Sequence, residues 1–198
     1  MTHVIITGGI GSGKSVVSRM LTVMGYPVYD CDSQAITLID HDLQLRADMV
    51  ALLGSEAYDA QGHYNRHWVA TRVFGNRTML EQINALVHPA VIRDINRWTQ
   101  GLDCSMCFVE TALMRQSGLN LMADAIWRVT APDDVRILRV VRRSGLTASQ
   151  VAQRIEAQRS KEAPFDGETV LVNDNSRTLL TQVLEALATL NNFNTKNL

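Results

Sequence analysis

Eight consecutive residues near the start of the chain have the types and the spacing that bind a phosphate chain. Residues 8–15 read Gly-Gly-Ile-Gly-Ser-Gly-Lys-Ser, which fits G-x-x-x-x-G-K-[ST] at every fixed position, and they follow the apolar run of residues 4–6. Glycines allow positive φ angles, so successive backbone N–H groups can converge on phosphate oxygens. We therefore predict a strand, a phosphate loop (residues 8–15) and a helix that begins near Gly13 and adds positive potential from its dipole. The alternative is a glycine turn that binds nothing.

The loop residues also indicate which ligands bind. Lys14 can reach the β- and γ-phosphates of a nucleotide, and the Ser15 hydroxyl stands where such loops coordinate the Mg²⁺ that bridges those phosphates. ATP with Mg²⁺ is therefore the expected ligand pair. The loop residues that we expect to bind ATP are Gly11, Ser12, Gly13, Lys14, Ser15 and Val16.

Acidic side chains that end predicted strands are candidates for the chemistry of phosphoryl transfer. In an open parallel sheet, ligands gather at the carboxyl ends of the strands, so these carboxylates are expected beside the phosphate loop. Asp32 follows a short predicted strand, residues 28–30, and could take the proton of an acceptor hydroxyl. Glu110 ends another strand and could orient water ligands of Mg²⁺. Alternatively, either Asp30 or Asp32 caps the following helix.

Arginines crowd into one third of the chain, and their planar guanidinium groups suit bidentate contact with phosphate. They are Arg128, Arg136, Arg139, Arg142, Arg143, Arg154 and Arg159. Ser144-Gly145-Leu146 separates two predicted helices that carry most of them, which indicates a glycine-hinged hairpin that could close as a lid. We expect Arg143 to contact the transferred phosphate or the ATP chain, with Arg139 and Arg142 in support. The alternative is a solvated helix face.

Five short apolar segments alternate with helical patterns, which predicts an α/β fold with a parallel sheet covered on both faces. The predicted strands are residues 4–7, 28–30, 106–109, 126–130 and 169–172. A length of 198 residues favours a single domain. We divide it into a core (about 1–32, 104–135 and 165–190), an inserted helical lobe (about 33–103) and a lid (about 136–164). His88-Pro89 is expected to interrupt the helices of the lobe, and Ser176 to cap the last helix.

Composition argues against several classes of partner. The net charge of −1 disfavours a dedicated nucleic-acid binder, and no apolar run approaches the ~20 residues of a membrane span. The first residues show no secretory signal, and three unevenly placed cysteines are typical of a reducing compartment, so we expect a cytoplasmic protein.

Cys104 and Cys107 form C-x-x-C, but a zinc site would need two more ligands, and the candidates His63 and His67 lie in another segment. The other interpretation places Cys107 in a buried strand.

Further sequence elements, in order along the chain, carry a specific resemblance. They are Asp30-x-Asp32, Asn65-Arg66 after Gly62, Val73-Phe74, Asn84-x-x-x-His88-Pro89-x-Val91, Ser117-Gly118-Leu119, Ala131-Pro132, Arg139 with Arg143, Arg154-Ile155 with Gln158, and Asp174-Asn175. Together with the phosphate loop, they make the chain from residue 4 to about residue 190 similar to the dephospho-coenzyme A kinase family. The resemblance implies a three-layer α/β/α P-loop core with five parallel strands, a helical coenzyme A lobe and a lid. It also implies transfer of the ATP γ-phosphate to the ribose 3′-hydroxyl of dephospho-CoA.

The same resemblance implies roles for residues outside the loop. Asp32, Arg66 and His88 would place dephospho-CoA, and Asn175 would contact ATP; a hydrogen-bonded core histidine is the other interpretation of His88. Four residues depart from the family's usual pattern: Val16 stands in place of threonine, Ile36 of arginine, Ala112 of proline and Gln116 of glutamate. These departures bear on details of substrate binding.

Rival functions stay open at this level. Another small-molecule P-loop kinase, acting on a nucleoside monophosphate or a sugar acid, would carry the same loop. A regulatory nucleotide-binding protein would explain Asp59-Ala-Gln-Gly62, which spells D-x-x-G, but no predicted buried strand precedes it and no N-K-x-D follows. The intact Lys14, Ser15 and Asp32 disfavour an inactive binder. We expect a monomer or small homo-oligomer without nucleic-acid or membrane partners.

Overall fold

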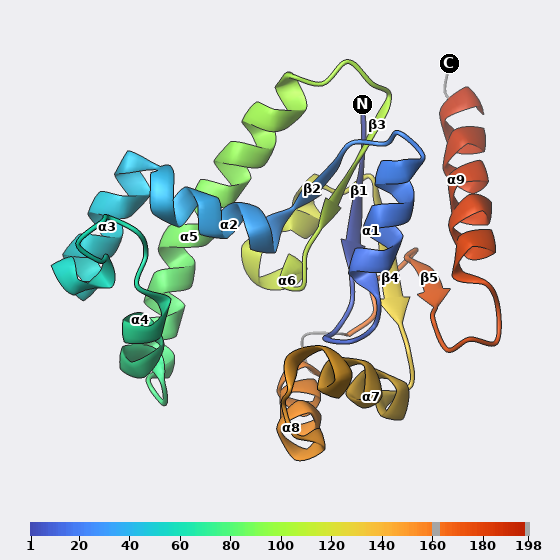
Figure 1. The fold of residues 1–198 in the computed structure, drawn as a ribbon. Helices are drawn as coiled ribbons and strands as arrows, with labels where there is room; N and C mark the ends of the chain where they lie inside the picture. The colour runs from blue at the N-terminus through green and yellow to red at the C-terminus, as the bar shows by residue number, and fades with distance from the viewer. Residues whose placement is uncertain (160–162, 197–198) are drawn as a thin grey trace. The chain divides into compact units, whose positions relative to one another are not determined.

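The computed structural model describes residues 1–159 and 163–196, with side chains as far as Asn192 (Figure 1). Five strands form one sheet in the order β2-β3-β1-β4-β5. They are β1 Thr2–Thr7, β2 Val28–Asp30, β3 Met106–Glu110, β4 Ala125–Thr130 and β5 Thr169–Val172. The pairings of β1 with β3, β1 with β4, and β4 with β5 are parallel. The predicted α/β fold with a five-stranded parallel sheet is confirmed, and each strand lies within about two residues of its predicted bounds.

Helices connect the strands in the predicted alternating order. They are α1 Lys14–Val23, α2 Cys31–His41, α3 Leu43–Leu53, α4 Arg66–Val73, α5 Arg77–Gln100, α6 Met114–Ser117, α7 Asp133–Ser144, α8 Ala148–Arg159 and α9 Leu179–Lys196, with the short 3₁₀ helices η1 Ser55–Ala57 and η2 Leu119–Met122. Within the described ranges, no helix is both long and apolar enough to cross a bilayer. The chain forms two compact units, one of Met1–Tyr29 with Cys104–Leu198 and one of Asp30–Asp103.

The core of the first unit lies on the face of the sheet that α1 and α9 cover. Alternate strand residues point to opposite faces, and Ile6 of β1 is among those on this side. Leu21 of α1 and Val183 of α9 pack against the sheet and are fully buried. Phe108 and Trp127 lie in the same core with their ring centroids 5.3 Å apart. This packing holds the end of β1 and the start of α1, and the phosphate loop connects the two.

Cys107 lies in β3 and is fully buried, which agrees with the second interpretation of the C-x-x-C sequence. Burial raises the pKa of the Cys107 thiol to about 11, because a thiolate is poorly solvated in an apolar interior. The part of the chain that the structure describes holds no group of His, Cys, Asp and Glu side chains able to bind a metal ion. The zinc interpretation of Cys104 and Cys107 therefore gains no support.

We expect Cys107 to resist alkylation in the native protein. At pH 8 a thiol with a pKa of about 11 is a thiolate in roughly one molecule in a thousand, and the reagent has no access to the buried sulfur. Mass spectrometry after iodoacetamide treatment should show labelling of Cys107 at least ~100-fold slower in the native protein than in urea. The half-buried Cys104 serves as the internal comparison. Equal labelling rates of Cys107 in both conditions would contradict its burial.

A side chain from α9 binds the outer edge of the sheet. β5 is an edge strand, so within residues 1–159 and 163–196 its outward backbone groups have no neighbouring strand. Gln182 Oε1 accepts a hydrogen bond from the Val172 N–H at 2.8 Å, and Gln182 Nε2 donates to the Val172 carbonyl oxygen, also at 2.8 Å. Gln182 is itself buried. This amide therefore pairs with β5 much as a residue of a neighbouring strand would.

The predicted cap at Ser176 is wrong, because α9 begins three residues later, at Leu179. The Ser176 N–H and hydroxyl both donate to Asp174 Oδ1, at 2.8 and 2.6 Å. An aspartate two residues before a serine favours such a local turn. Because the Ser176 hydroxyl is hydrogen-bonded in this turn, it does not cap the helix, and α9 begins further along the chain.

The second unit consists of helices joined by turns, and α5 packs against both α2 and α3. One turn forms where the sequence predicts it: the Asp59 carboxylate accepts the N–H groups of Gln61 and His63, at 3.0 and 2.8 Å. Gly62 in this turn has a φ of +84°, which glycine adopts without strain.

The predicted interruption at His88-Pro89 is wrong, because α5 continues through Pro89 without a break. A proline inside a helix removes one backbone donor and crowds the preceding turn, at a cost of ~3 kcal/mol. On this helix Val87 and Val91 are buried, on the side that packs within the unit. We conclude that burial of this stripe against neighbouring helices outweighs the local cost of the proline.

Candidate active site

The phosphate loop joins β1 to α1 and has the backbone geometry that its glycines predict. Gly11 and Gly13 have φ angles of +78° and +107°. A Cβ at Gly11 would lie 2.7 Å from the Arg136 carbonyl oxygen, and a Cβ at Gly13 would collide with the Asn173 amide. Gly13 is the N-cap of α1, and none of the side chains that the structure describes caps this helix end. The N-terminus of α1 is therefore accessible to an anion, whose charge the helix dipole would stabilise.

Lys14 and Ser15 form the first turn of α1. Lys14 Nζ donates to the Gly8 carbonyl oxygen at 2.8 Å, so its ammonium group lies back over the loop. Both residues are half-buried. A hydroxyl such as that of Ser15 suits Mg²⁺, which prefers oxygen ligands and binds through few protein groups, keeping waters and substrate phosphates as its other ligands. The residues present thus fit a nucleotide-bound Mg²⁺.

Glu110 lies at the carboxyl end of β3, where β1 leads into the phosphate loop. The strand register pairs Ile6 with Glu110, and the Thr111 N–H donates to the Ile6 carbonyl oxygen at 2.9 Å. Glu110 is half-buried. Its carboxylate therefore lies at the edge of the sheet that carries the loop, as the order of the strands predicts.

A cavity of about 510 Å³ opens beside the start of α1. It is lined by Gly13 and Val16 from the loop and α1, by Arg139 from α7, and by Asn173, Asn175 and Arg177 from the segment after β5. Small-molecule sites typically have volumes of ~300–1,000 Å³, so this space suits a nucleoside. Residues that the sequence predicts to bind ATP thus come together here from three distant segments.

Asn173 holds Arg139 at this cavity. Arg139 Nη2 donates to Asn173 Oδ1 at 3.2 Å, and Asn173 Nδ2 donates to the Ser12 carbonyl oxygen at 2.9 Å. Arg139 Nη1 is buried and has no hydrogen-bond partner among the described residues. A buried cationic donor of this kind fits an anionic ligand, since an unmade hydrogen bond there is costly.

Sequence reasoning missed Asn173, although a usable signal existed. Asn173 is the first residue after β5, and the Asn173 N–H donates to the Thr130 carbonyl oxygen at 2.8 Å. The rule on strand ends that selects Asp32 and Glu110 selects Asn173 as well. Asn175, which the sequence did predict, has a φ of +70°, a value that the described chain otherwise shows only at glycines.

The arginine cluster lies on a helical hairpin, as predicted. α7 ends at Ser144, and Gly145 follows with a φ of +69°. Thr147 and Gln150 then form a reciprocal capping box: the Thr147 N–H donates to Gln150 Oε1 at 2.9 Å, and the Gln150 N–H donates to Thr147 Oγ1 at 3.3 Å. The capping box begins α8 directly after the turn, so the hairpin connection is short and well defined.

The arginines of the cluster divide by their surroundings. Three of them form ion pairs within the first unit, namely Arg128, Arg136 and Arg159. Arg139 lines the cavity, whereas Arg142 and Arg143 are exposed near the end of α7. Only part of the cluster is therefore available to a ligand, and contact between Arg143 and phosphate stays a prediction.

In the second unit, Asp30 is the residue that caps α2. Asp30 Oδ1 accepts the N–H groups of Asp32 and Ser33 at 3.0 and 3.3 Å, and Asp30 Oδ2 accepts the Ser33 hydroxyl at 2.6 Å. Asp32 lies in the first turn of α2 and is exposed. The capping role that the sequence left open between the two aspartates thus belongs to Asp30.

Two further predicted site residues lie in the same unit. Arg66 is the first residue of α4 and is exposed, after a helix cap in which Asn65 Oδ1 accepts the Trp68 N–H at 3.1 Å. His88 lies inside α5 and is half-buried. Contact of Arg66 and His88 with substrate stays a prediction.

Known proteins resemble this chain over most of its length. A family model described as "Dephospho-CoA kinase" matches residues 2–179. A protein named Dephospho-CoA kinase from Porphyromonas gingivalis is 37% identical over 191 residues, which cover 96% of this chain and 94% of that protein. A protein of the same name from Bacteroides fragilis is 37% identical over 185 residues, covering 92% of this chain and 90% of that protein. The crystal structure of TT1252 from Thermus thermophilus has a TM-score of 0.80 and 29% identity to this chain, covering 95% of this chain and 96% of that one.

Proposed function

The chain belongs to the dephospho-CoA kinase family, and from this membership we propose that it transfers the γ-phosphate of ATP to the ribose 3′-hydroxyl of dephospho-CoA. The products are coenzyme A and ADP, so the reaction is the last step of coenzyme A biosynthesis. The enzyme is thus a phosphotransferase with an alcohol acceptor, built on a P-loop kinase fold.

The observation that carries this proposal is the cavity at the start of α1, with a buried Arg139 Nη1 that lacks a partner among the described residues. The cavity continues from Gly13 of the phosphate loop to Asn175, so it can hold the nucleoside of ATP while the loop binds the phosphates. The open N-terminus of α1 and the Lys14 ammonium supply positive charge at the loop.

Phosphoryl transfer depends mainly on positioning and charge neutralisation. Lys14 would bind the β- and γ-phosphates, exchanging its contact with the Gly8 carbonyl for phosphate oxygens. Mg²⁺, held through Ser15 and through waters oriented by Glu110, would offset negative charge on the same phosphates. Arg143 would contact the transferred phosphate, with Arg139 and Arg142 in support.

The acceptor side of the reaction is assigned to the second unit. We infer that Asp32 accepts the proton that the ribose 3′-hydroxyl loses during transfer. This role is compatible with the local structure, because Asp30 and not Asp32 caps α2. Arg66 and His88 would help to place dephospho-CoA. We also infer a cytoplasmic enzyme that acts as a monomer or small homo-oligomer.

A coupled assay that detects ADP tests the proposed function. The purified chain with ATP and Mg²⁺ should turn over dephospho-CoA far faster than nucleoside monophosphates or sugar acids. Omission of Mg²⁺ or its removal by a chelator should abolish turnover. Turnover of another acceptor with dephospho-CoA inert would replace the proposed substrate, and ATP binding without any turnover would indicate a regulatory protein.

Arg143→Lys should lower kcat by about tenfold or more, because lysine keeps the charge but lacks the planar fork that binds phosphate through two hydrogen bonds. Arg142→Lys, on the same exposed turn of α7, should have a smaller effect. Steady-state kinetics of both variants with ATP and dephospho-CoA provide the measurement. If both variants turn over like the parent enzyme, the exposed arginines form a solvated helix face and have no role at the phosphate.

A further inference from the structure

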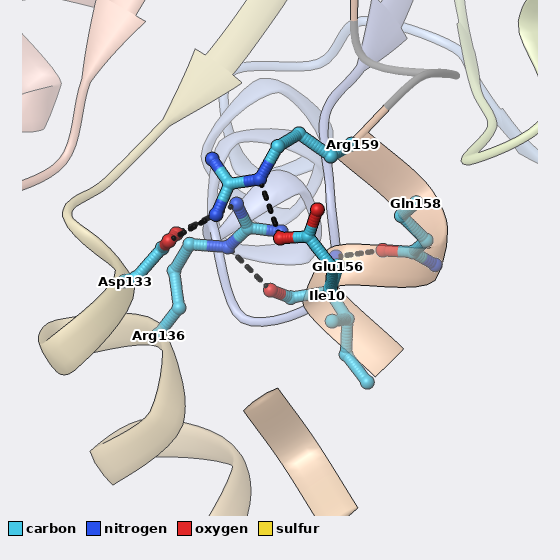
Figure 2. A network of polar contacts seen from close by, with 6 residues as sticks. All are labelled: Ile10, Asp133, Arg136, Glu156, Gln158 and Arg159. Carbon is cyan, nitrogen blue, oxygen red and sulfur yellow. Dashed lines mark hydrogen bonds and ion pairs between the residues drawn. The ribbon is translucent and has the colours of Figure 1, made fainter. Parts of the chain in front are cut away.

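Ile10, at the turn of the phosphate loop, is bound through its main chain by both helices of the hairpin (Figure 2). The Ile10 N–H donates to Gln158 Oε1 of α8 at 2.8 Å. The Ile10 carbonyl oxygen accepts a hydrogen bond from Arg136 Nε of α7 at 2.9 Å. We call Arg136 and Gln158 the Ile10 clamp.

The arginine of the Ile10 clamp is itself fixed in place. Arg136 is buried, and its Nη1 forms an ion pair with Asp133 Oδ1 at 3.3 Å. Asp133 Oδ2 in turn binds Arg159 Nη2 at 2.9 Å, and Arg159 Nε binds Glu156 Oε2 at 2.7 Å (Figure 2). These ion pairs hold α7 against α8, and the two helices carry the two side chains of the Ile10 clamp.

The Ile10 clamp sets the orientation of two peptide planes in the loop. In a trans peptide, the carbonyl and the N–H point in opposite directions. The Ile10 carbonyl points to Arg136, so the Gly11 N–H on the same plane must point away from Arg136. The Ile10 N–H points to Gln158, which directs the Gly9 carbonyl to the opposite side, where it accepts the Ser12 N–H at 3.2 Å.

Such control matters because the loop is rich in glycine. Peptide planes beside glycines rotate at little cost, so several orientations of the Gly11 N–H compete when nothing holds the plane. Phosphate then binds only the molecules in which the loop already has the right orientation. The apparent affinity is the intrinsic affinity multiplied by the fraction of such molecules, so a small fraction means weak binding.

We propose that Arg136 and Gln158 are positioning residues for ATP, which hold the Ile10 peptide groups so that the loop N–H groups face the phosphates before ATP binds. The proposal rests on the proposed function only in taking ATP as the ligand of the loop. It assigns to the hairpin a task at the loop itself, separate from contacts between its exposed arginines and phosphate.

Gln158 is the better residue for a test, because removing the buried Arg136 would also break the ion pairs of the hairpin. Gln158→Met keeps the length of the side chain but leaves the Ile10 N–H without its acceptor. Gln158→Glu keeps an acceptor oxygen at the same place. Gln153→Met, at an exposed position on the same helix, is the matched control.

The measurements are the Kd of a non-hydrolysable ATP analogue with Mg²⁺ by calorimetry, the KM of each substrate, and the Tm. We expect Gln158→Met to raise the Kd of the analogue and the KM of ATP by roughly tenfold, as follows if the loop has the binding orientation in only about one variant molecule in ten before ATP binds. The KM of dephospho-CoA and the Tm should change little. Gln158→Glu should recover most of the affinity, and Gln153→Met should bind like the parent.

Several outcomes would overturn the proposal. One is a Gln158→Met enzyme that binds the analogue as tightly as the parent; another is a Gln158→Glu enzyme as weak as Gln158→Met. Equal losses for both substrates with a lowered Tm would show a purely structural role. If the parent enzyme itself fails to bind the analogue, the assignment of the loop to ATP fails too, and this result is distinct from the preceding ones.

Discussion

Lys14→Ala is expected to lower kcat with ATP and dephospho-CoA by on the order of 10³-fold or more, while the protein stays folded. Removal of a single preorganised donor at a developing charge costs on the order of 10²–10³-fold in other enzymes, and Lys14 is placed to serve two phosphates at once. The fold should tolerate the change, because Lys14 Nζ contacts the Gly8 carbonyl of the loop and its side chain is outside the apolar core.

The matched control for this variant is Arg19→Ala. Arg19 is exposed on the same helix, so its replacement removes one positive charge without touching the loop. Steady-state kinetics and thermal unfolding of both variants separate local binding of phosphate from the general field of the protein. Normal turnover by a folded Lys14→Ala enzyme would show that this loop is not the ATP site.

Asp32→Asn is expected to lower kcat by on the order of 10²-fold or more, with little change in ATP affinity. Asparagine keeps the size and much of the hydrogen bonding of aspartate but cannot accept the proton of the ribose hydroxyl. The local fold should be unaffected, because the cap of α2 is Asp30 and Asp32 is exposed. Kinetics with dephospho-CoA and an ATP-binding titration give the two quantities.

Asp30→Asn is the control for the Asp32 variant. Asparagine caps a helix about as well as aspartate does, so this change should leave kcat within a few fold of the parent. If Asp30→Asn loses activity while Asp32→Asn retains it, the proton is taken by Asp30, and the assignment of the base moves to the residue that ends β2.

Much of the fold could be predicted because its signals are local. Short apolar segments mark each strand, and the phosphate loop carries its glycines at fixed spacing. The capping box of Thr147 and Gln150 lies within four residues. Each signal depends on the preferences of a few consecutive residues, so it can be recognised in the sequence without the structure.

The errors have the opposite origin. Local preference predicts a break at Pro89, but α5 continues because its buried stripe packs against other helices of its unit. Ser176 has the right type for a helix cap, yet Asp174 binds it first. In both places an interaction with another part of the chain outweighs the local conformational preference of the residue: packing between helices at Pro89, and a hydrogen bond two residues away at Ser176.

The least predictable part of the candidate site is the set of contacts between distant segments. Asn173 joins Ser12 to Arg139, and the Ile10 clamp joins the loop to residues more than 100 positions away. The sequence does not indicate which distant backbone group a polar side chain will bind.

The amide of Gln182 has a consequence for the behaviour of the protein at high concentration. Val170 and Val172 of the edge strand β5 have exposed side chains, and an edge of this kind invites strands from other molecules to add to the sheet and begin aggregation. Because Gln182 binds both the N–H and the carbonyl of Val172, an incoming strand has to displace this amide before it can pair with the end of β5. We therefore expect this end of β5 to resist the addition of a strand from another molecule.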